Sequence, residues 1–239
     1  AKAVFLPEEF RGFRYADALQ EFRARLPALA HVVRVRAGAR GGGAGAGSMR
    51  YEDVAAAGRG KSVAPAKSEP GDLKMRMYTS GTTGRAKGVL HSHNSLQAEN
   101  WMRVTHLGLS DRDVMFNPSP VGHVTGALYS LCLPFTVGIT TVMLDIWEVD
   151  LGLEMMRRRK VSGIVAATIF LQGLVDEAKR RSESLPDLRF FLCGGAQVPP
   201  DLVREASRVF PNCIPSRIYG STEVPCITAG VNSPGQLDQ

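Results

Sequence analysis

The sequence predicts an α/β fold in which a mostly parallel β-sheet is flanked by helices. Short apolar runs rich in β-branched residues recur along the chain, and helical stretches separate most of them. The expected strands are residues 73–79, 113–117, 139–144, 163–167, 188–192 and 214–219. The expected helices are residues 94–107, 126–137, 151–159, 170–181 and 200–210. Strands that alternate with helices favour a parallel sheet covered on both faces, in which ligands bind at the carboxyl ends of the strands.

The first 70 residues are expected to form a separate, partial N-terminal subdomain. The expected elements are strands at 3–6 and 31–36 and helices at 15–26 and 51–57. Residues 37–48 contain too much glycine to hold a helix or a strand, which predicts a flexible surface loop. A polar stretch with proline and glycine, residues 58–71, separates residues 1–70 from the larger α/β part at residues 71–239.

The composition is that of an ordinary globular protein, with 44% hydrophobic and 22% charged residues among 239. No apolar run reaches the length of a membrane span, and the opening residues carry no pattern that would predict a secretory signal. The formal charge of +6 includes a basic run at residues 157–160, which we interpret as a solvated helix face rather than a nucleic-acid site. Cys132, Cys193, Cys213 and Cys226 are widely spaced, so we expect reduced thiols in a cytoplasmic protein.

A loop rich in hydroxyl side chains follows the expected strand at residues 73–79. It consists of Thr79, Ser80, Gly81, Thr82, Thr83 and Gly84. Its glycines permit positive φ and a close approach of ligand to backbone, while its hydroxyls and successive N–H groups can surround an anion. Lys87 adds a positive charge suited to terminal phosphates. The alternative is an ordinary hairpin turn, which does not require so many hydroxyls and a lysine.

Two further motifs lie downstream, and with this loop they resemble the adenylate-forming superfamily of acyl-CoA synthetases, luciferases and peptide-synthetase adenylation domains. Residues 79–88 match the family's Thr-Ser-Gly-Thr-Thr-Gly-x-Pro-Lys-Gly loop, with Ala86 in place of the proline. Residues 194–196 match its adenine-side Gly-Gly-Ala loop, and residues 219–223 match Tyr-Gly-x-Thr-Glu. The resemblance, strongest over residues 71–230, implies the central part of the family's multi-layered N-terminal domain.

The resemblance also implies a role for each motif residue. Glu223 is expected to bind Mg²⁺, for which a carboxylate is a suitable hard ligand. Thr222 is expected to contact the α-phosphate, Tyr219 to pack against adenine, and Lys87 to reach the terminal phosphates. By the same resemblance, Lys87, Thr222 and Glu223 are the expected catalytic residues. The residues expected to bind ATP or AMP are Thr79, Ser80, Gly81, Thr82, Thr83, Gly84, Lys87, Gly194, Gly195, Ala196, Tyr219, Gly220, Ser221 and Thr222.

A fourth segment, residues 118–126, resembles the part of the family that lies near the acyl carboxylate and the CoA tunnel. We expect His123, Val124 and Thr125 to bind the acid substrate. A lone histidine before an apolar helix is otherwise a packed or surface residue, and this remains the alternative for His123. The other histidines, including His91 and His93, show no partner carboxylate or cysteine spacing and are interpreted as structural or exposed.

The activity implied by the resemblance is AMP-forming ligation of an acid to a thiol. A small or medium carboxylic acid reacts with ATP to give an acyl-adenylate, and CoA then displaces AMP. An amino-acid-activating adenylation domain is one alternative, but residues 122–125 offer no acid to pair with a substrate ammonium. A nucleotide-binding module without turnover is another. The sequence does not contain the family's later Thr-Gly-Asp motif or its small C-terminal domain with a catalytic lysine, so we expect poor turnover from this chain alone.

Overall fold

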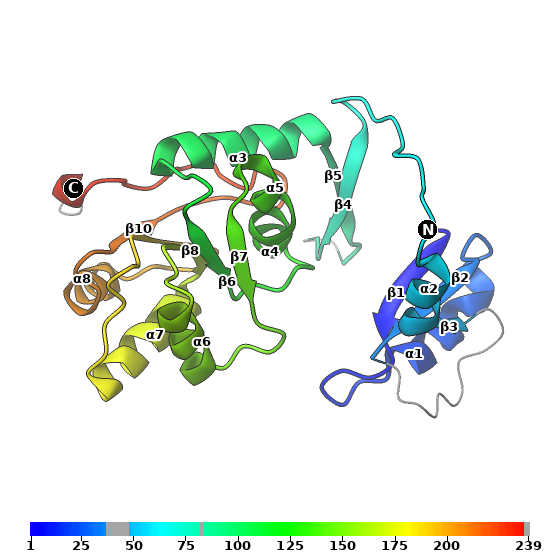
Figure 1. Ribbon diagram of the computed structural model, residues 1–239, viewed down its shortest axis with the longest axis horizontal. Helices are drawn as coiled ribbons and strands as arrows, with labels where there is room; N and C mark the ends of the chain where they lie inside the picture. Colours follow the sequence, from blue (N-terminus) through cyan, green and yellow to red (C-terminus); the bar gives the residue numbers. More distant parts are fainter. Residues whose placement is uncertain (37–47, 82–83, 237–239) are drawn as a thin grey trace. The chain divides into compact units, whose positions relative to one another are not determined.

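The computed structural model describes residues 1–36, 48–81 and 84–236 (Figure 1). The chain packs as two units, Ala1–Lys67 and Ser68–Gln239, and each is described by itself. All but the last residue of the glycine-rich stretch 37–48, together with Thr82 and Thr83, lie outside the described residues. The subdomain boundary expected after residue 70 remains a prediction.

The first unit is a small parallel sheet with two helices. Its strands pair in the order β1, β2, β3. Its elements are β1 (Ala3–Pro7), α1 (Tyr15–Phe22), η1 (Arg23–Arg25), β2 (His31–Val35), β3 (Ser48–Arg50) and α2 (Tyr51–Gly58). Strand β3 was not expected from the sequence, and the helix expected at residues 15–26 narrows to a 3₁₀ turn after Phe22. A small core of Leu6, Ala16, Leu29 and Val32 joins α1 to the sheet.

The second unit contains the parallel sheet expected from the alternating pattern. Its strands are β6 (Val114–Asn117), β7 (Thr140–Met143), β8 (Gly163–Ala167), β9 (Phe190–Gly194) and β10 (Ile214–Arg217). They pair in the order β10-β9-β8-β6-β7, and every pairing is parallel. The strand order reverses between β6 and β8. Ligands of open parallel sheets bind outside the carboxyl ends of the strands at such a reversal.

Helices cover both faces of this sheet (Figure 1). One face carries α3 (His93–Leu107), α4 (Val124–Ala127), η2 (Leu128–Cys132) and α5 (Pro134–Val137). The other carries α6 (Val149–Arg158), α7 (Thr168–Arg181) and α8 (Pro200–Val209). Successive strand residues point to opposite faces, so Phe116 and Ile164 pack in the core beneath α6 to α8, whereas Met115 and Val165 pack beneath α3 and η2.

The strand at residues 73–79 does not belong to the parallel sheet. It is β4 (Leu73–Thr79), which pairs antiparallel with β5 (Lys87–Ser92) as a separate hairpin. No strand was expected at residues 87–92. Because β5 is followed at once by α3, its short apolar pattern merges with that of the helix, and the pairing partner becomes visible only in three dimensions.

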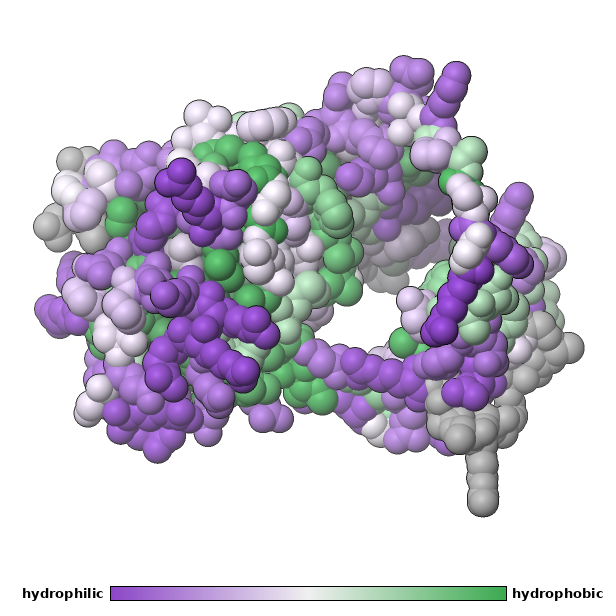
Figure 2. All heavy atoms as spheres, in the orientation of Figure 1, coloured by the Kyte–Doolittle hydropathy of each residue, from purple (hydrophilic) through white to green (hydrophobic). Residues whose placement is uncertain are grey.

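The surface of the α6 to α8 layer is strongly hydrophilic (Figure 2). The basic residues 157–160 are all exposed there. No helix within the described ranges is long and apolar enough to cross a membrane. Cys132, Cys193 and Cys213 are buried free thiols, and Cys226 is a half-buried one.

Candidate active site

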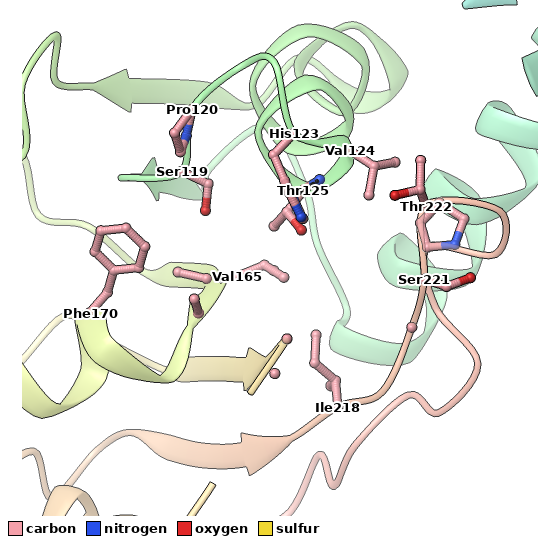
Figure 3. A pocket seen from close by; sticks show the side chains of 16 residues that line it. Ser119, Pro120, His123, Val124, Thr125, Val165, Phe170, Ile218, Ser221 and Thr222 are labelled. Atoms are coloured by element: carbon pink, nitrogen blue, oxygen red, sulfur yellow. Dashed lines mark hydrogen bonds between the residues drawn. The ribbon is translucent and has the colours of Figure 1, made fainter. Parts of the chain in front are cut away.

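A cavity of about 420 Å³ opens at the carboxyl ends of the parallel strands. Residues that follow β6, β8, β9 and β10 line it, which is the location expected from the reversal of strand order. Figure 3 shows Phe170 toward one end of the cavity, Ser221 and Thr222 toward the other, and Val165 between them. The site-motif residues on its walls are His123, Val124, Thr125, Gly194, Gly195, Gly220, Ser221 and Thr222.

The Tyr219–Thr222 part of one motif forms a tight turn after β10. The carbonyl of Tyr219 accepts hydrogen bonds from the N–H groups of Ile227 (2.8 Å) and Thr228 (3.0 Å), so the chain folds back on itself as an isolated antiparallel bridge. Within the turn, the N–H of Ser221 donates to the carbonyl of Val224 at 2.9 Å. The side chain of Tyr219 is 63% exposed and is not among the residues on the cavity wall.

Gly220 is needed because the turn brings its backbone very close to residues 224–225. A Cβ atom at Gly220 would lie 2.1 Å from the carbonyl oxygen of Pro225, closer than real Cβ contacts allow. The glycine therefore lets the two segments touch, and a larger residue would push the motif away from residues 224–228.

Glu223 ends the motif as an exposed carboxylate. Its own backbone N–H and the Ser221 hydroxyl hold the pKa of Glu223 below its usual value, and the positive charge of Lys87 acts in the same direction. The carboxylate is thus ionised at neutral pH. A single exposed carboxylate fits Mg²⁺, which binds one or two protein carboxylates and completes its shell with phosphate oxygens and water. No group of three or more potential metal ligands is present in the part of the chain that the structure describes.

The hydroxyl-rich loop is the connection of the β4–β5 hairpin. Gly81 has a φ of +64°, and a Cβ there would lie 2.2 Å from the carbonyl oxygen of Arg85, so this position needs glycine. Lys87 is the first residue of β5 and is exposed. Thr79, Ser80, Gly81, Gly84 and Lys87 are not on the cavity wall. The positive charge of Lys87 acts to lower the pKa of Glu223.

His91 joins the hairpin to the Tyr219–Glu223 motif. It lies on β5, is 3% exposed, and its Nε2 is 2.8 Å from the carbonyl oxygen of Thr222. The interpretation of His91 as structural is consistent with this burial. The partner is a backbone carbonyl far along the chain, and no spacing of acidic or sulfur side chains could reveal it.

His123 caps the helix that forms another wall of the cavity. Its Nδ1 accepts a hydrogen bond from the N–H of Thr125 at 3.3 Å, so in the neutral ring the proton is on Nε2. Figure 3 shows the ring beside Thr125 at the cavity. His123 can therefore donate a hydrogen bond to an anionic oxygen bound in the cavity.

Asn117, at the end of β6, organises the segment that carries His123 and was not singled out from the sequence. It is 2% exposed, and its Oδ1 accepts from the N–H of Ser119 at 2.9 Å. Its Nδ2 donates to the carbonyls of Thr125 (3.3 Å) and Gly126 (3.4 Å). The one sequence signal was a polar amide at the end of an apolar strand.

The third motif begins at the end of β9. Gly194 and Gly195 line the cavity, whereas Ala196 is exposed and is not on its wall. Part of the Gly194–Ala196 motif and part of the Tyr219–Glu223 motif therefore line the cavity at one edge of the sheet, whereas no described residue of the hydroxyl-rich loop is on its wall.

Comparison with known proteins identifies the family. The family model for AMP-binding enzymes matches residues 1–239. The chain is 32% identical over 224 residues to a medium-chain fatty-acid–CoA ligase of Escherichia coli K12, covering 93% of this chain and 38% of that protein. It is 34% identical over 233 residues to a 3-[(3aS,4S,7aS)-7a-methyl-1,5-dioxo-octahydro-1H-inden-4-yl]propanoyl:CoA ligase of Mycobacterium tuberculosis, covering 93% of this chain and 43% of that protein.

A solved structure shows the same fold. An anthranilate–CoA ligase in complex with anthranoyl-AMP superposes with a TM-score of 0.78 at 22% identity, covering 93% of this chain and 41% of that one. The chain thus spans well under half the length of these relatives. The matched family and the parallel sheet, with the Gly194–Ala196 and Tyr219–Glu223 motifs at its carboxyl edge, agree: this chain belongs to the family of AMP-binding enzymes.

Proposed function

We propose that this chain supplies the adenylate-binding part of an acid–thiol ligase that activates a carboxylic acid with ATP and transfers the acyl group to CoA. The observation that carries the proposal is the convergence of Thr222, His123 and the Gly194–Gly195 backbone on one cavity at the reversal of strand order. Relatives named as CoA ligases support the same reaction class.

The reaction needs charge neutralisation more than proton transfer. A carboxylate oxygen of the acid forms a bond to the α-phosphorus of ATP, the bond to the bridging oxygen breaks, and pyrophosphate leaves. In the second step the CoA thiol gives up its proton to solvent and its sulfur bonds to the acyl carbon, the bond from that carbon to the phosphate oxygen breaks, and AMP leaves with that oxygen. In this proposal Thr222, the loop N–H groups and Lys87 would stabilise negative charge on phosphate, and His123 Nε2–H would orient the carboxylate; Thr222 and His123 on the cavity wall support this. Mg²⁺ at Glu223 would neutralise phosphate charge when bound.

The cavity favours an uncharged acyl group. The described residues on its wall include no Asp, Glu, Lys or Arg, and apolar side chains of Val165, Phe170 and Ile218 cover much of it. The ammonium group of an amino acid would find no carboxylate partner on this wall, and burying an unpaired charge is costly. We therefore propose an uncharged, largely apolar acid in preference to an amino acid.

Binding of a non-hydrolysable acyl-adenylate mimic to this chain tests the proposal. Calorimetric titration should show Mg²⁺-sensitive binding of the mimic with an apolar acyl group, and weaker binding of the mimic with an aminoacyl group. Thr222→Ala should weaken binding by about tenfold, since a hydrogen bond to a charged group is worth about 1.5–3 kcal/mol. Thr105→Ala, at an exposed position on α3, serves as the matched control. Equal affinity in Thr222→Ala and the control would contradict the assignment of the site.

A further inference from the structure

Arg103 is a fully buried arginine that contacts the chain beyond the Tyr219–Glu223 motif. It lies on α3 and is 1% exposed. Its Nε donates to the hydroxyl of Tyr129 at 3.1 Å, its Nη1 donates to the carbonyl of Ala229 at 2.9 Å, and its Nη2 donates to the sulfur of Cys226. One side chain thus joins two helices to residues 226–229, a segment without regular secondary structure.

Residues 226–229 are the partners against which the motif folds back. The carbonyl of Tyr219 accepts from the N–H groups of Ile227 and Thr228, and the N–H of Tyr219 donates to the Thr228 hydroxyl at 2.8 Å. The Cys226 thiol in turn donates to the carbonyl of Thr228 at 3.2 Å. A continuous series of hydrogen bonds therefore leads from the Arg103 guanidinium to the turn that begins at Tyr219.

Glu99, one helical turn before Arg103, compensates the buried positive charge. It is 3% exposed. Burial raises the pKa of Glu99 above its usual value, although the positive charge of Arg103 and hydrogen bonding with Cys226 and Tyr129 act to lower it. Among the described residues Glu99 Oε1 has no hydrogen-bond partner. Removing Arg103 alone would therefore leave a buried carboxylate uncompensated, which is more destabilising than removing both charges together.

We propose that Arg103 is a positioning residue: it fixes residues 226–229, and through them it sets the geometry of the Tyr219–Thr222 turn at the cavity. The fork of the guanidinium is suited to this task because it donates in three directions from a planar, preorganised group. The effect on ligand affinity rests on the proposed function, whereas the effect on the turn itself does not.

The test compares Arg103→Met with the double variant Glu99→Gln/Arg103→Met in this 239-residue chain. The double variant removes the uncompensated charge and should recover part of the thermal midpoint that the single variant loses. Amide hydrogen exchange of Tyr219, Ile227 and Thr228 is followed in both, together with the affinity for the acyl-adenylate mimic. Arg103→Lys is the milder, conservative variant, and it remains informative if Arg103→Met does not fold.

We expect exchange at these three amides to rise by about tenfold or more in the double variant while exchange in the parallel sheet returns to the wild-type rate. Affinity for the mimic should fall by about tenfold. Arg103→Lys should show amide exchange and affinity for the mimic between those of the wild type and those of the double variant, because an ammonium cannot make three diverging contacts. Recovery of exchange and affinity along with the thermal midpoint would overturn the proposal, since Arg103 would then act through stability alone.

Two other outcomes are equally decisive. Faster exchange with unchanged affinity would show that the turn does not control the ligand, and would refute the link to the site. If the wild-type chain does not bind the mimic, the proposed function fails, yet the exchange rates in the double variant still decide whether Arg103 holds the turn.

Discussion

His91 and Thr222 are joined by a hydrogen bond between residues that are far apart in the chain. Nε2 of His91 lies 2.8 Å from the carbonyl oxygen of Thr222, and because a carbonyl only accepts, Nε2 carries the proton. The bond ties the strand that follows the hydroxyl-rich loop to the turn that carries Thr222 and Glu223. Two motifs that the sequence presents separately are thus held at a fixed separation by a residue outside both.

Replacing His91 should therefore loosen the site as well as the fold. We expect His91→Ala to lower the free energy of unfolding by about 1–3 kcal/mol, the usual cost of leaving a partner unsatisfied. His91→Gln keeps an N–H donor of similar reach and should restore part of the loss. Urea unfolding measures the free energy of unfolding, and titration with the acyl-adenylate mimic measures the effect on the site. Equal affinity in His91→Ala and His91→Gln would show that the contact does not shape the site.

Replacing Asn117 should weaken binding of the acyl group, which we propose lies near His123, more than binding of the nucleotide near Thr222. Its amide holds Ser119 on one side and the carbonyls of Thr125 and Gly126 on the other. Asn117→Asp keeps the acceptor but turns a buried carboxylate toward two carbonyls, so the segment that carries His123 should shift. We expect affinity for the acyl-adenylate mimic to fall by about tenfold or more while affinity for AMP changes little.

Paired titrations of the Asn117 variants with AMP and with the mimic separate these effects. Asn117→Ala removes both contacts without adding charge and should lie between the wild type and Asn117→Asp. A parallel loss of both affinities would indicate general unfolding of the cavity, and would contradict a selective role for Asn117.

The parallel sheet and its helices could be predicted because each element is encoded locally. Residues 163–167 form a short buried β-branched run and residues 200–210 carry a proline-led amphipathic pattern, and the strand and helix lie there within a residue or two. Strand β5 was missed because its six residues lead directly into α3 without a turn signal.

The residues that organise the site were harder to predict than the motifs. The motifs are contiguous in the sequence, whereas His91, Asn117 and Arg103 act through backbone carbonyls of other segments, which for His91 and Arg103 lie 131 and 126 residues away. Every residue has a backbone carbonyl, so residue type does not show which one accepts a given hydrogen bond. Pairing of this kind is decided by tertiary packing, so only the fold reveals which buried polar residue meets which loop.

Phe170 should limit the size of the acyl group. Its ring lines the cavity and packs edge-on against Trp147, with centroids 5.1 Å apart, and Trp147 in turn packs against the fully buried Phe116. Because Trp147 and Phe116 support it, the Phe170 ring should not move aside for a longer acyl group. We expect Phe170→Ala to shift preference toward longer acyl groups by about tenfold or more, since each methylene in an apolar pocket is worth about 1–3 kcal/mol.

A series of acyl-adenylate mimics of increasing chain length measures this preference for Phe170→Ala. Ile169→Ala is the matched control, because Ile169 is the neighbouring residue on α7, is 75% exposed and is not on the cavity wall. An unchanged order of affinities in Phe170→Ala would place the acyl group elsewhere in the cavity.

Asp113 stabilises the opposite, amino end of the parallel sheet. Its carboxylate accepts from the Ser162 hydroxyl at 2.8 Å, from Arg189 Nη2 at 2.6 Å and from the N–H of Ser110 at 2.9 Å. Partial burial acts to raise the pKa of Asp113, but these donors outweigh it and hold the pKa below the usual 3.8. The unfolded chain therefore takes up this proton at higher pH than the folded chain does.

It follows that the stabilisation from Asp113 is complete above the usual pKa of 3.8 and is lost as the pH falls through the lower, folded value. Asp113→Asn should lower the free energy of unfolding at neutral pH by about 1–3 kcal/mol and should flatten its decline in the acid range. Asp187→Asn, at a nearby exposed position, is the control and should leave both unchanged. Urea unfolding between neutral pH and the acid range measures the difference. A decline in Asp113→Asn as steep as that of the control would show that other carboxylates govern the acid transition.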